Sequence, residues 1–361
     1  MKVIHLPTSV GGNSFGLSRG ERELGIQSDV LVLFQNRFQF PADRCIFKKP
    51  PGNIISNYTK RIWIPALLKE LFSIVKKYDV FHFNFGTSLL DLWMFGLPLL
   101  DLPYYRNKGK IVVTYNGCDA RMKYDTIERT HFSACHDNRC STLCNTGMYD
   151  KIKRKKISKF DSYADSIFAV NPDILHFLPE RARFLPYTVA KWPNIITLPY
   201  QSVKKRIKIL HAPSHRITKG SSIIIEALEK VKKIYGNKIE TILLENLPND
   251  DALKLYDDAD LVIDQVLIGF YGAFAVETMK MGKPVMAFIR KEDMHYMPQQ
   301  MADDCLDTII NVSPDSIYEK LCEIVENPEL LKKHREAALD YVHRWHDPVY
   351  VAGITKATYE N

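Results

Sequence analysis

The sequence predicts an α/β protein built from two doubly wound domains, and three observations support this prediction. The chain has 361 residues, which suggests two domains at about 100–200 residues each. Short apolar, β-rich runs alternate with segments of helical periodicity along the whole chain, which implies parallel sheets with right-handed crossovers. The pattern also restarts, because Ile207–Pro213 opens the second half much as Val3–Pro7 opens the first.

The expected strands form two groups of five. They are, in the first half, Val3–Leu6, Asp29–Phe34, Val80–Phe85, Ile111–Tyr115 and Ser166–Val170 and, in the second half, Ile207–His211, Glu240–Leu244, Leu261–Asp264, Pro284–Ile289 and Thr308–Val312. Apolar residues that recur every three or four positions predict helices over Arg61–Lys77, Ser221–Tyr235 and Leu330–Trp345.

A Pro- and Tyr-rich stretch without periodicity, Phe184–Gln201, predicts the break between the domains. We expect an N-terminal domain over 1–185, a linker over 186–204 and a C-terminal domain over 205–344. Ligands of doubly wound sheets bind at the carboxyl ends of the strands. We therefore expect two Rossmann-like domains that face a central cleft, with the active site in that cleft.

Charge is spread unevenly along the chain. Residues 1–200 hold 28 Lys and Arg against 17 Asp and Glu, a balance of +11, whereas the rest of the chain has a balance of −4. The densest run is Lys151–Lys159, which is either a solvated helix face or a surface attracted to anionic lipid headgroups or a phosphate-bearing acceptor. Aromatic residues do not interleave with this run, so nucleic acid is not an expected partner.

No apolar stretch approaches the ~20 residues of a membrane span. We expect a cytoplasmic protein, with peripheral contact at the inner face of the membrane through the basic N-terminal domain as the extension of that view. Seven cysteines, of which three cluster, are not typical of a secreted disulfide scaffold.

Three loops carry residues suited to bind a nucleotide. The first is Gly11-Gly12-Asn13-Ser14, between the first strand and the first helix. Glycines there let the backbone approach a phosphate at the helix N-terminus. The alternative is a glycine turn with Asn13 or Ser14 as the N-cap.

The second loop is Ser214–Gly220, which follows the strand ending at His211. It places Arg216 and Lys219 at the start of a helix, where positive charge is unfavourable unless an anion is bound. A pyrophosphate would fit this arrangement. The alternative is a solvated loop.

The third loop runs from Gly269 to Pro284. Gly272 would open a helix that carries Glu277, and a carboxylate on the buried side of a helix needs a partner. Ribose hydroxyls would serve. The alternative is a surface glutamate on an amphipathic helix.

Residues 205–355, with HAPSHRITKG and ADLVIDQVLIGFYGAFAVETMKMGKPV, resemble the donor-binding half of retaining GT-B glycosyltransferases of family 4 (glycosyl transferases group 1). The resemblance implies that Lys219 holds the donor diphosphate, with Arg216 or Ser214 near the position of the family's arginine. It implies that Glu277 binds the ribose. The family's other glutamate falls on Gly269, so the backbone amides of Phe270, Tyr271, Gly272 and Ala273 would take part of its role.

The first half resembles the same family more loosely. Gly11, Gly12 and Asn13 match its diphosphate-contacting loop, and Asp79–Asn84 resembles its DVVHxH strand with Asn84 in place of the second His. Thr114–Asp119 resembles its THGxD loop with Asn116 in place of His, which makes Asn116 and Asp119 candidate catalytic residues on the acceptor side. By the same resemblance, residues 345–361 pack back on the N-terminal domain.

The cysteine-rich segment is a separate candidate. His131, Cys135, Cys140 and Cys144 lie close together in sequence, with His136 among them, and thiolates with imidazoles can hold a structural zinc ion. The alternatives are buried thiols or a reversible disulfide. We expect the segment to shape the acceptor pocket.

The resemblance implies a retaining glycosyltransferase of the hexosyltransferase type. It would move a sugar from a nucleoside-diphosphate sugar to a glycan, a lipid-linked or another hydroxyl acceptor, in surface polysaccharide synthesis. No cofactor is expected, and no metal at the diphosphate, because cationic side chains would replace it. The alternatives are a GT-B sugar epimerase and a degenerate GT-B protein that binds nucleotide-sugar or glycan without turnover.

Overall fold

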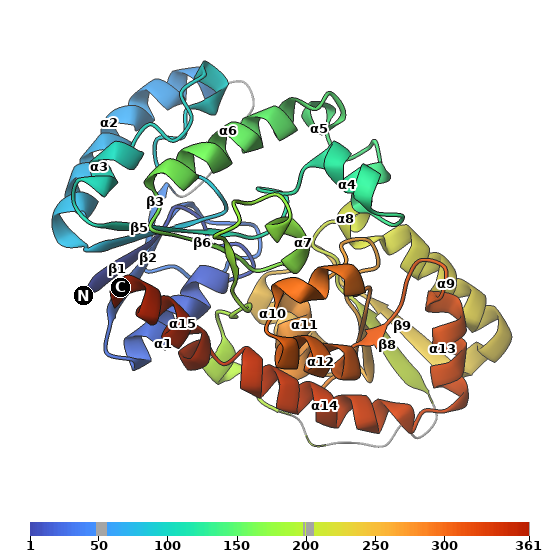
Figure 1. Ribbon diagram of the computed structural model, residues 1–361. Coiled ribbons are helices and arrows are strands. Elements are labelled where there is room, and N and C mark those ends of the chain that lie inside the picture. The colour runs from blue at the N-terminus through green and yellow to red at the C-terminus, as the bar shows by residue number, and fades with distance from the viewer. Residues whose placement is uncertain (48–55, 198, 200–205, 361) are drawn as a thin grey trace. The chain divides into compact units, whose positions relative to one another are not determined.

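The computed structural model describes residues 1–47, 56–197, 199 and 206–360, and these fall into two compact units. The first unit comprises Met1–Met122, Tyr149–Ala190 and Pro348–Asn361, and the second comprises Lys123–Met148 and Lys191–Asp347. Part of the expected linker, at 198 and 200–204, lies outside the described residues. Each unit is a parallel sheet covered by helices on both faces (Figure 1).

The described part of the first unit forms a seven-stranded sheet in the order β3-β2-β1-β4-β5-β6-β7. All its neighbouring strands pair in parallel. The strands are β1 (Lys2–Leu6), β2 (Gln27–Phe34), β3 (Arg44–Phe47), β4 (Val80–Asn84), β5 (Lys110–Tyr115), β6 (Ser166–Ala169) and β7 (Arg183–Phe184). The strand order reverses between β1 and β4, which makes that pair the switch point of the sheet.

Helices cover both faces of this sheet (Figure 1). On one face lie α1 (Asn13–Glu23) and α15 (Pro348–Glu360), which pack side by side. On the other lie α2 (Ser56–Lys77), α3 (Leu102–Arg106) and α6 (Met148–Tyr163). The remaining helices of this unit are η1 (Trp93–Phe95) and α7 (Pro172–Leu175). Apolar residues of β1, α1 and α15 share one core cluster, so the end of the chain completes the unit that the start of the chain begins.

The described part of the second unit forms a five-stranded parallel sheet in the order β12-β11-β10-β8-β9. Its strands are β8 (Ile207–His211), β9 (Ile239–Leu243), β10 (Leu261–Ile263), β11 (Val285–Ala287) and β12 (Ile310–Asn311). The order reverses between β8 and β10, so residues that follow these two strands share one crevice at the sheet edge.

Helices α9 (Ser221–Tyr235) and α13 (Ile317–Glu326) pack together on one face of the second sheet (Figure 1). The opposite face carries α10 (Asn249–Tyr256), α11 (Ala273–Lys280), α12 (Gln299–Thr308) and α14 (Leu330–Trp345). The shorter helices of this unit are α4 (Lys123–Arg129), η2 (Ala134–His136), α5 (Thr142–Asn145), η3 (Trp192–Asn194), α8 (Arg216–Lys219), η4 (Gly236–Lys238) and η5 (Lys291–Tyr296).

The compact units differ from the expected boundaries most at one segment. Residues 123–148, which we assigned to the N-terminal domain, group with the second unit. Two contacts within that unit explain the grouping, because Arg129 pairs with buried Asp293 and the Ala134 amide donates to the Leu267 carbonyl. Such long-range contacts leave no periodic trace in the sequence.

Among the described residues, no helix is both long and apolar enough to cross a membrane.

Candidate functional site

At the switch point of the second sheet, one buried histidine ties β8 to its neighbours. His211 ends β8, and its Nδ1 lies 2.8 Å from the Ile263 carbonyl of β10. Its Nε2 lies 2.8 Å from the Ser221 hydroxyl, at the start of α9. Burial lowers the pKa of His211, so the ring is neutral near pH 7 and acts as a fixed hydrogen-bonding link rather than as a cation.

A buried carboxylate, Asp264, lies at the same switch point directly after β10. The Nζ of Lys219 lies 2.6 Å from its Oδ1, and the backbone amide of Gly272 donates to its Oδ2 at 2.6 Å. The Asp264 side chain is fully covered, whereas Lys219 remains partly exposed. One carboxylate therefore holds the loop after β8 and the start of α11 together, and the lysine that it pairs with keeps 13% of its side chain exposed.

Sequence reasoning singled out Lys219 and Gly272 but missed Asp264. The signal was present, since a lone acid directly follows an apolar strand. What could not be read was its partner, because Lys219 precedes it by 45 positions.

Glu277 lies in the second turn of α11 and is buried, with 3% of its surface exposed. Burial raises its pKa to about 7, against the opposing effect of a 3.0 Å hydrogen bond from the Asn249 side chain. Burial of the same kind raises the pKa of nearby Tyr256 well above its usual value, and the charges of Glu277 and Asp264 add to this effect. This carboxyl group is therefore poised to change protonation near neutrality.

The other two residues of the second loop are placed differently from Lys219. Arg216 forms a bidentate pair with Glu245 at 2.8 and 2.6 Å, and more than half of its side chain is exposed. Ser214 is exposed between β8 and α8. Arg216 therefore lies on the same sheet edge as Lys219 but turns to a different carboxylate.

In the loop from Gly269 to Ala273, the large side chains are buried, so a ligand would meet backbone groups rather than these side chains. Gly269 has φ +84°, and a Cβ there would lie 3.1 Å from the Cβ of Arg290. Phe270 and Tyr271 are fully buried, and the Tyr271 hydroxyl lies 2.8 Å from His346 Nε2. The two rings therefore belong to the core, and Gly269 is held to glycine by both backbone conformation and space.

In the first unit, the Gly11–Asn13 turn is packed against a later segment of the same unit. Gly12 has φ +73°, and a Cβ there would lie 2.7 Å from the Cβ of Ala190. The Asn13 side-chain oxygen accepts from the Thr188 amide at 2.8 Å, and Ser14 donates to the Thr8 carbonyl. Gly12 itself is the N-cap of α1, with no side-chain capping bond, so neither Asn13 nor Ser14 is the N-cap.

The two amide side chains at the carboxyl edge of the first sheet bond to backbone. Asn84 donates to the His82 carbonyl, and Asn116 donates to the Thr114 carbonyl. Asp119 accepts from the backbone amides of Asn116 and Gly117, at 2.7 to 3.1 Å. Burial raises the pKa of Asp119 to about 6, although these backbone hydrogen bonds oppose the shift.

The cysteine-rich segment lies in the second unit. Cys135 is in η2, Cys144 is in α5 and Cys140 lies between these helices. His131 packs edge-on against Phe132, with ring centroids 4.4 Å apart. Among the described residues, the group of three or more potential metal ligands that gathers within 4.8 Å is a different one, His5, Glu21 and His82. The zinc site over 131–144 stays a prediction.

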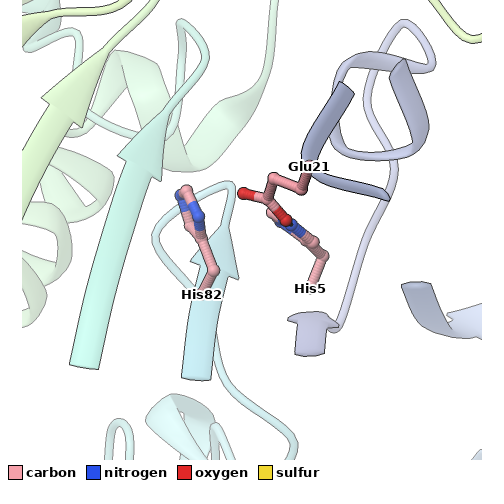
Figure 2. Close-up of side chains that lie close together, drawn as sticks. All are labelled: His5, Glu21 and His82. Atoms are coloured by element: carbon pink, nitrogen blue, oxygen red, sulfur yellow. The ribbon is translucent and has the colours of Figure 1, made fainter. Parts of the chain in front are cut away.

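Figure 2 shows the His5, Glu21 and His82 group, in which Glu21 directs its carboxylate toward both rings. His5 Nε2 lies 2.9 Å from Glu21. His82 uses both ring nitrogens, toward the Tyr359 hydroxyl at 2.7 Å and the Thr114 hydroxyl at 2.6 Å.

Hydrogen bonds already saturate much of this group. The Tyr359 hydroxyl donates to Glu21 at 2.7 Å, and burial lowers the pKa of His82 well below its usual value. Burial alone would raise the pKa of Glu21, but His5 and the surrounding hydroxyls lower it. The ligating atoms that a metal would need are largely engaged. We therefore assign the group a structural role, in which it fixes α15 to α1 and β4.

The basic run on α6 is divided between two roles. Lys153 donates to the Arg121 carbonyl at 2.6 Å, Lys159 donates to the Pro98 carbonyl at 2.8 Å, and Lys156 pairs with Asp91 at 2.6 Å. These three lysines share one helix face and serve the unit's own packing. Lys151 and Lys155 are exposed.

No family model and no curated protein sequence matches this chain. Solved structures do match along its full length. Sucrose-phosphate synthase from Thermosynechococcus elongatus has a TM-score of 0.57 at 13% identity, covering 100% of this chain and 98% of that one. The UDP-GlcNAc 2-epimerase from Neisseria meningitidis bound to UDP-GlcNAc has a TM-score of 0.56 at 15% identity, with 100% of both chains covered.

A third match, spinosyn forosaminyltransferase, has a TM-score of 0.50 at 11% identity and covers 100% of both chains. At these identities, the matches show the fold alone. Two Rossmann-like units with parallel sheets make this a GT-B fold, and the expected fold class is confirmed.

Proposed function

We propose that this protein is a glycosyltransferase that uses a nucleoside-diphosphate sugar as its donor. The observation that carries the proposal is that Lys219 and the Gly272 amide both bond to the Asp264 carboxylate, at the switch point of the second sheet. Donor ligands of doubly wound sheets bind in such crevices. Names of structures with the same fold include a transferase and an enzyme bound to a UDP-sugar.

Lys219 is the proposed diphosphate ligand. Its ammonium is held at 2.6 Å from Asp264 and its side chain stays partly exposed, so the ammonium is oriented before any anion arrives. In the reaction it would stabilise the negative charge that develops on the departing diphosphate. The amides that follow Gly272 at the start of α11 would add backbone donors, and the Gly11–Asn13 turn stays a proposed phosphate-binding loop of the first unit.

Glu277 is the proposed ribose ligand. A carboxylate that is buried with a single amide partner at 3.0 Å has remaining acceptor capacity, which two ribose hydroxyls would use. Its raised pKa of about 7 reflects burial, and hydrogen bonds from a bound ribose would favour the ionised form.

The acceptor is proposed to bind at the carboxyl edge of the first sheet, near Asn84, Asn116 and Asp119. This would be a glycan, a lipid-linked acceptor or another hydroxyl compound. The two amides cannot act as bases near neutral pH. A retaining mechanism, in which the leaving diphosphate accepts the acceptor's proton, removes the need for a base and is the mechanism we propose. The wider role would be surface polysaccharide synthesis.

The test is a transfer assay with UDP-, GDP- and ADP-sugars and a mixture of sugar and lipid-linked acceptors. We expect acceptor-dependent release of one nucleoside diphosphate, and NMR of the product should show the donor's anomeric configuration. An inverted product would contradict the retaining mechanism alone. Release of an epimerised nucleotide-sugar without acceptor, or tight nucleotide binding without turnover on any acceptor, would contradict the transferase proposal.

A further inference from the structure

A short hairpin in the first unit presents exposed apolar side chains at its tip. Leu92 and Leu97 exchange both backbone hydrogen bonds, at 3.1 and 3.2 Å, and Gly96 closes the turn with φ +75°. Between them, Met94 and Phe95 are 65% and 68% exposed, and Leu97 is half exposed. We call Met94, Phe95 and Leu97 the apolar tip. Three large apolar side chains in water are unfavourable in free energy, because their burial would be favourable.

The base of the hairpin is held by contacts with the rest of the unit, so the position of the tip is well defined. Asp91 accepts from the Leu99 amide at 3.3 Å and pairs with Lys156 of α6 at 2.6 Å. Trp93 contacts Tyr149 at the start of α6, with ring centroids 6.0 Å apart. The hairpin is therefore braced by the helix that carries the basic run.

An apolar stripe lies on α2 in the same unit. Ile64, Leu68 and Phe72 recur at four-residue spacing and are all exposed, which places them along one side of the helix. Phe72 meets exposed Tyr104 of α3 edge-on, with ring centroids 6.4 Å apart. Such a stripe on a surface helix would normally face a core.

Exposed lysines are frequent on the helices of this part of the unit. The exposed charges include Lys69 and Lys76 on α2, Lys108 after α3, and Lys151 and Lys155 on α6. Three acids of α2 and of the segment before α3 are largely covered instead. Glu70 pairs with Arg44 at 2.7 Å, and Asp91 pairs with Lys156, while buried Asp101 accepts from the Leu90 amide at 3.1 Å. Exposed lysines therefore lie on the helix that carries the stripe and on the helix that braces the hairpin, with exposed Asp79 after the end of α2.

We propose that this face of the first unit docks on an anionic lipid bilayer, with the apolar tip inserted into the acyl boundary and the lysines against the headgroups. Exposed apolar groups with cationic neighbours match the two attractions of such a surface, and each lysine near the headgroups adds about 1 kcal/mol. A protein partner or a second copy would match the apolar groups but would have no need of the exposed lysines on α2 and α6. The inference does not depend on the donor chemistry.

The experiment is co-sedimentation of the full chain with vesicles of phosphatidylcholine, with and without phosphatidylglycerol. We expect binding that requires phosphatidylglycerol and weakens with salt. Changing Met94→Ser and Phe95→Ser together should weaken partition at least about tenfold, from the apolar area lost. Lys151→Gln with Lys155→Gln should weaken it by about fivefold per lysine, on anionic vesicles only.

The matched control is Ile196→Ser with Ile234→Ser, two exposed apolar residues of the second unit, which should leave partition unchanged. Trp93 fluorescence provides a second readout, since acyl chains that carry bromine should quench it, with Trp93→Phe as the reference. Equal binding to neutral vesicles, equal binding by the tip variant, or unquenched Trp93 would overturn the proposal. So would dimerisation that the tip variant abolishes in a chain that does not bind vesicles.

Discussion

The carboxyl edges of the two sheets carry very different side chains. At the carboxyl edge of the second sheet, charged groups meet: Lys219 pairs with Asp264, and Glu277 is buried on the following helix with a raised pKa. At the carboxyl edge of the first sheet, the amides Asn84 and Asn116 bond back to the backbone of their own strands.

This contrast shows that one architecture can be specialised by the residues placed directly after its strands. The second edge holds a partly exposed cation and carboxyls with remaining hydrogen-bonding capacity, which suits a charged, polyhydroxylated ligand. The first edge offers neutral amides and a carboxylate, Asp119, that is engaged in capping its own turn. Such an edge would select a ligand by its shape and hydrogen bonds rather than by its charge, as we propose for the acceptor.

The largest expected effect comes from Lys219→Ala. It leaves the Asp264 carboxylate buried without its cation, which should cost about 3–5 kcal/mol of unfolding free energy. Nucleoside-diphosphate affinity should fall by about thirtyfold or more, from the lost charge-assisted contact. Chemical denaturation and titration calorimetry measure the two effects separately.

The double variant Lys219→Ala with Asp264→Asn separates stability from binding. The neutral amide can still accept from the Gly272 amide, so most of the stability should return while the affinity does not. Recovery of nucleotide affinity in the double variant would show that Lys219 serves only to neutralise Asp264.

The next effect is a pH dependence that resides in Glu277. Burial raises its folded-state pKa to about 7 from the ordinary 4.5, so the folded state binds the proton more tightly than the unfolded chain. Stability from this group is therefore full below pH about 4.5 and falls as pH rises to about 7, by up to about 3 kcal/mol. Denaturation curves across this window should show the slope, and Glu277→Gln should remove it. A slope that persists in the Gln variant would refute this assignment.

Asp119→Ala tests the contrasting edge. It removes the acceptor of the Asn116 and Gly117 amides, so we expect a loss of about 1–3 kcal/mol in stability. Because the change lies in the first unit, nucleoside-diphosphate affinity should stay within about twofold, unlike that of Lys219→Ala. A large loss of donor affinity would argue against assigning the two edges to different substrates.

The smallest effect is expected from Arg216→Ala. Its bidentate pair with Glu245 is exposed, and such pairs contribute less than about 1 kcal/mol. We expect a change in nucleotide affinity of less than about threefold, with Lys230→Ala as a control that removes another exposed pair. A loss equal to that of Lys219→Ala would instead make Arg216 a full diphosphate ligand.

Much of this architecture was readable from periodicity alone. Three elements agree with prediction at both ends: the helices Ser221–Tyr235 and Leu330–Trp345 and the strand Ile207–His211. In each helix, apolar residues recur every three or four positions along its length. The strands β3 and β7 were missed. Arg44–Phe47 alternates too little to stand out, and Arg183–Phe184 spans two residues.

The site was readable only in part. Lys219, Gly272 and Glu277 were predicted from loop and helix patterns, and their role in binding stays a prediction. The link that Asp264 makes between Lys219 and Gly272 could not be predicted, because it depends on how distant segments meet in the fold. The same limit explains residues 123–148, whose Arg129 finds Asp293 at a separation of 164 positions. Sequence periodicity predicts local structure. Ion pairs between distant segments can be predicted only when the topology of the fold is known.

The buried network around Glu21 has a consequence for how the chain assembles itself. The core of the first unit contains Val3 and Leu17 but also Val351, Ala352 and Tyr359, so it cannot be complete until residues 351–359 have been synthesised. The second unit ends at Asp347. We therefore expect synthesis order and folding order to be opposed, with the later half reaching its native state first and the ring of Tyr359 closing the earlier half as the final step.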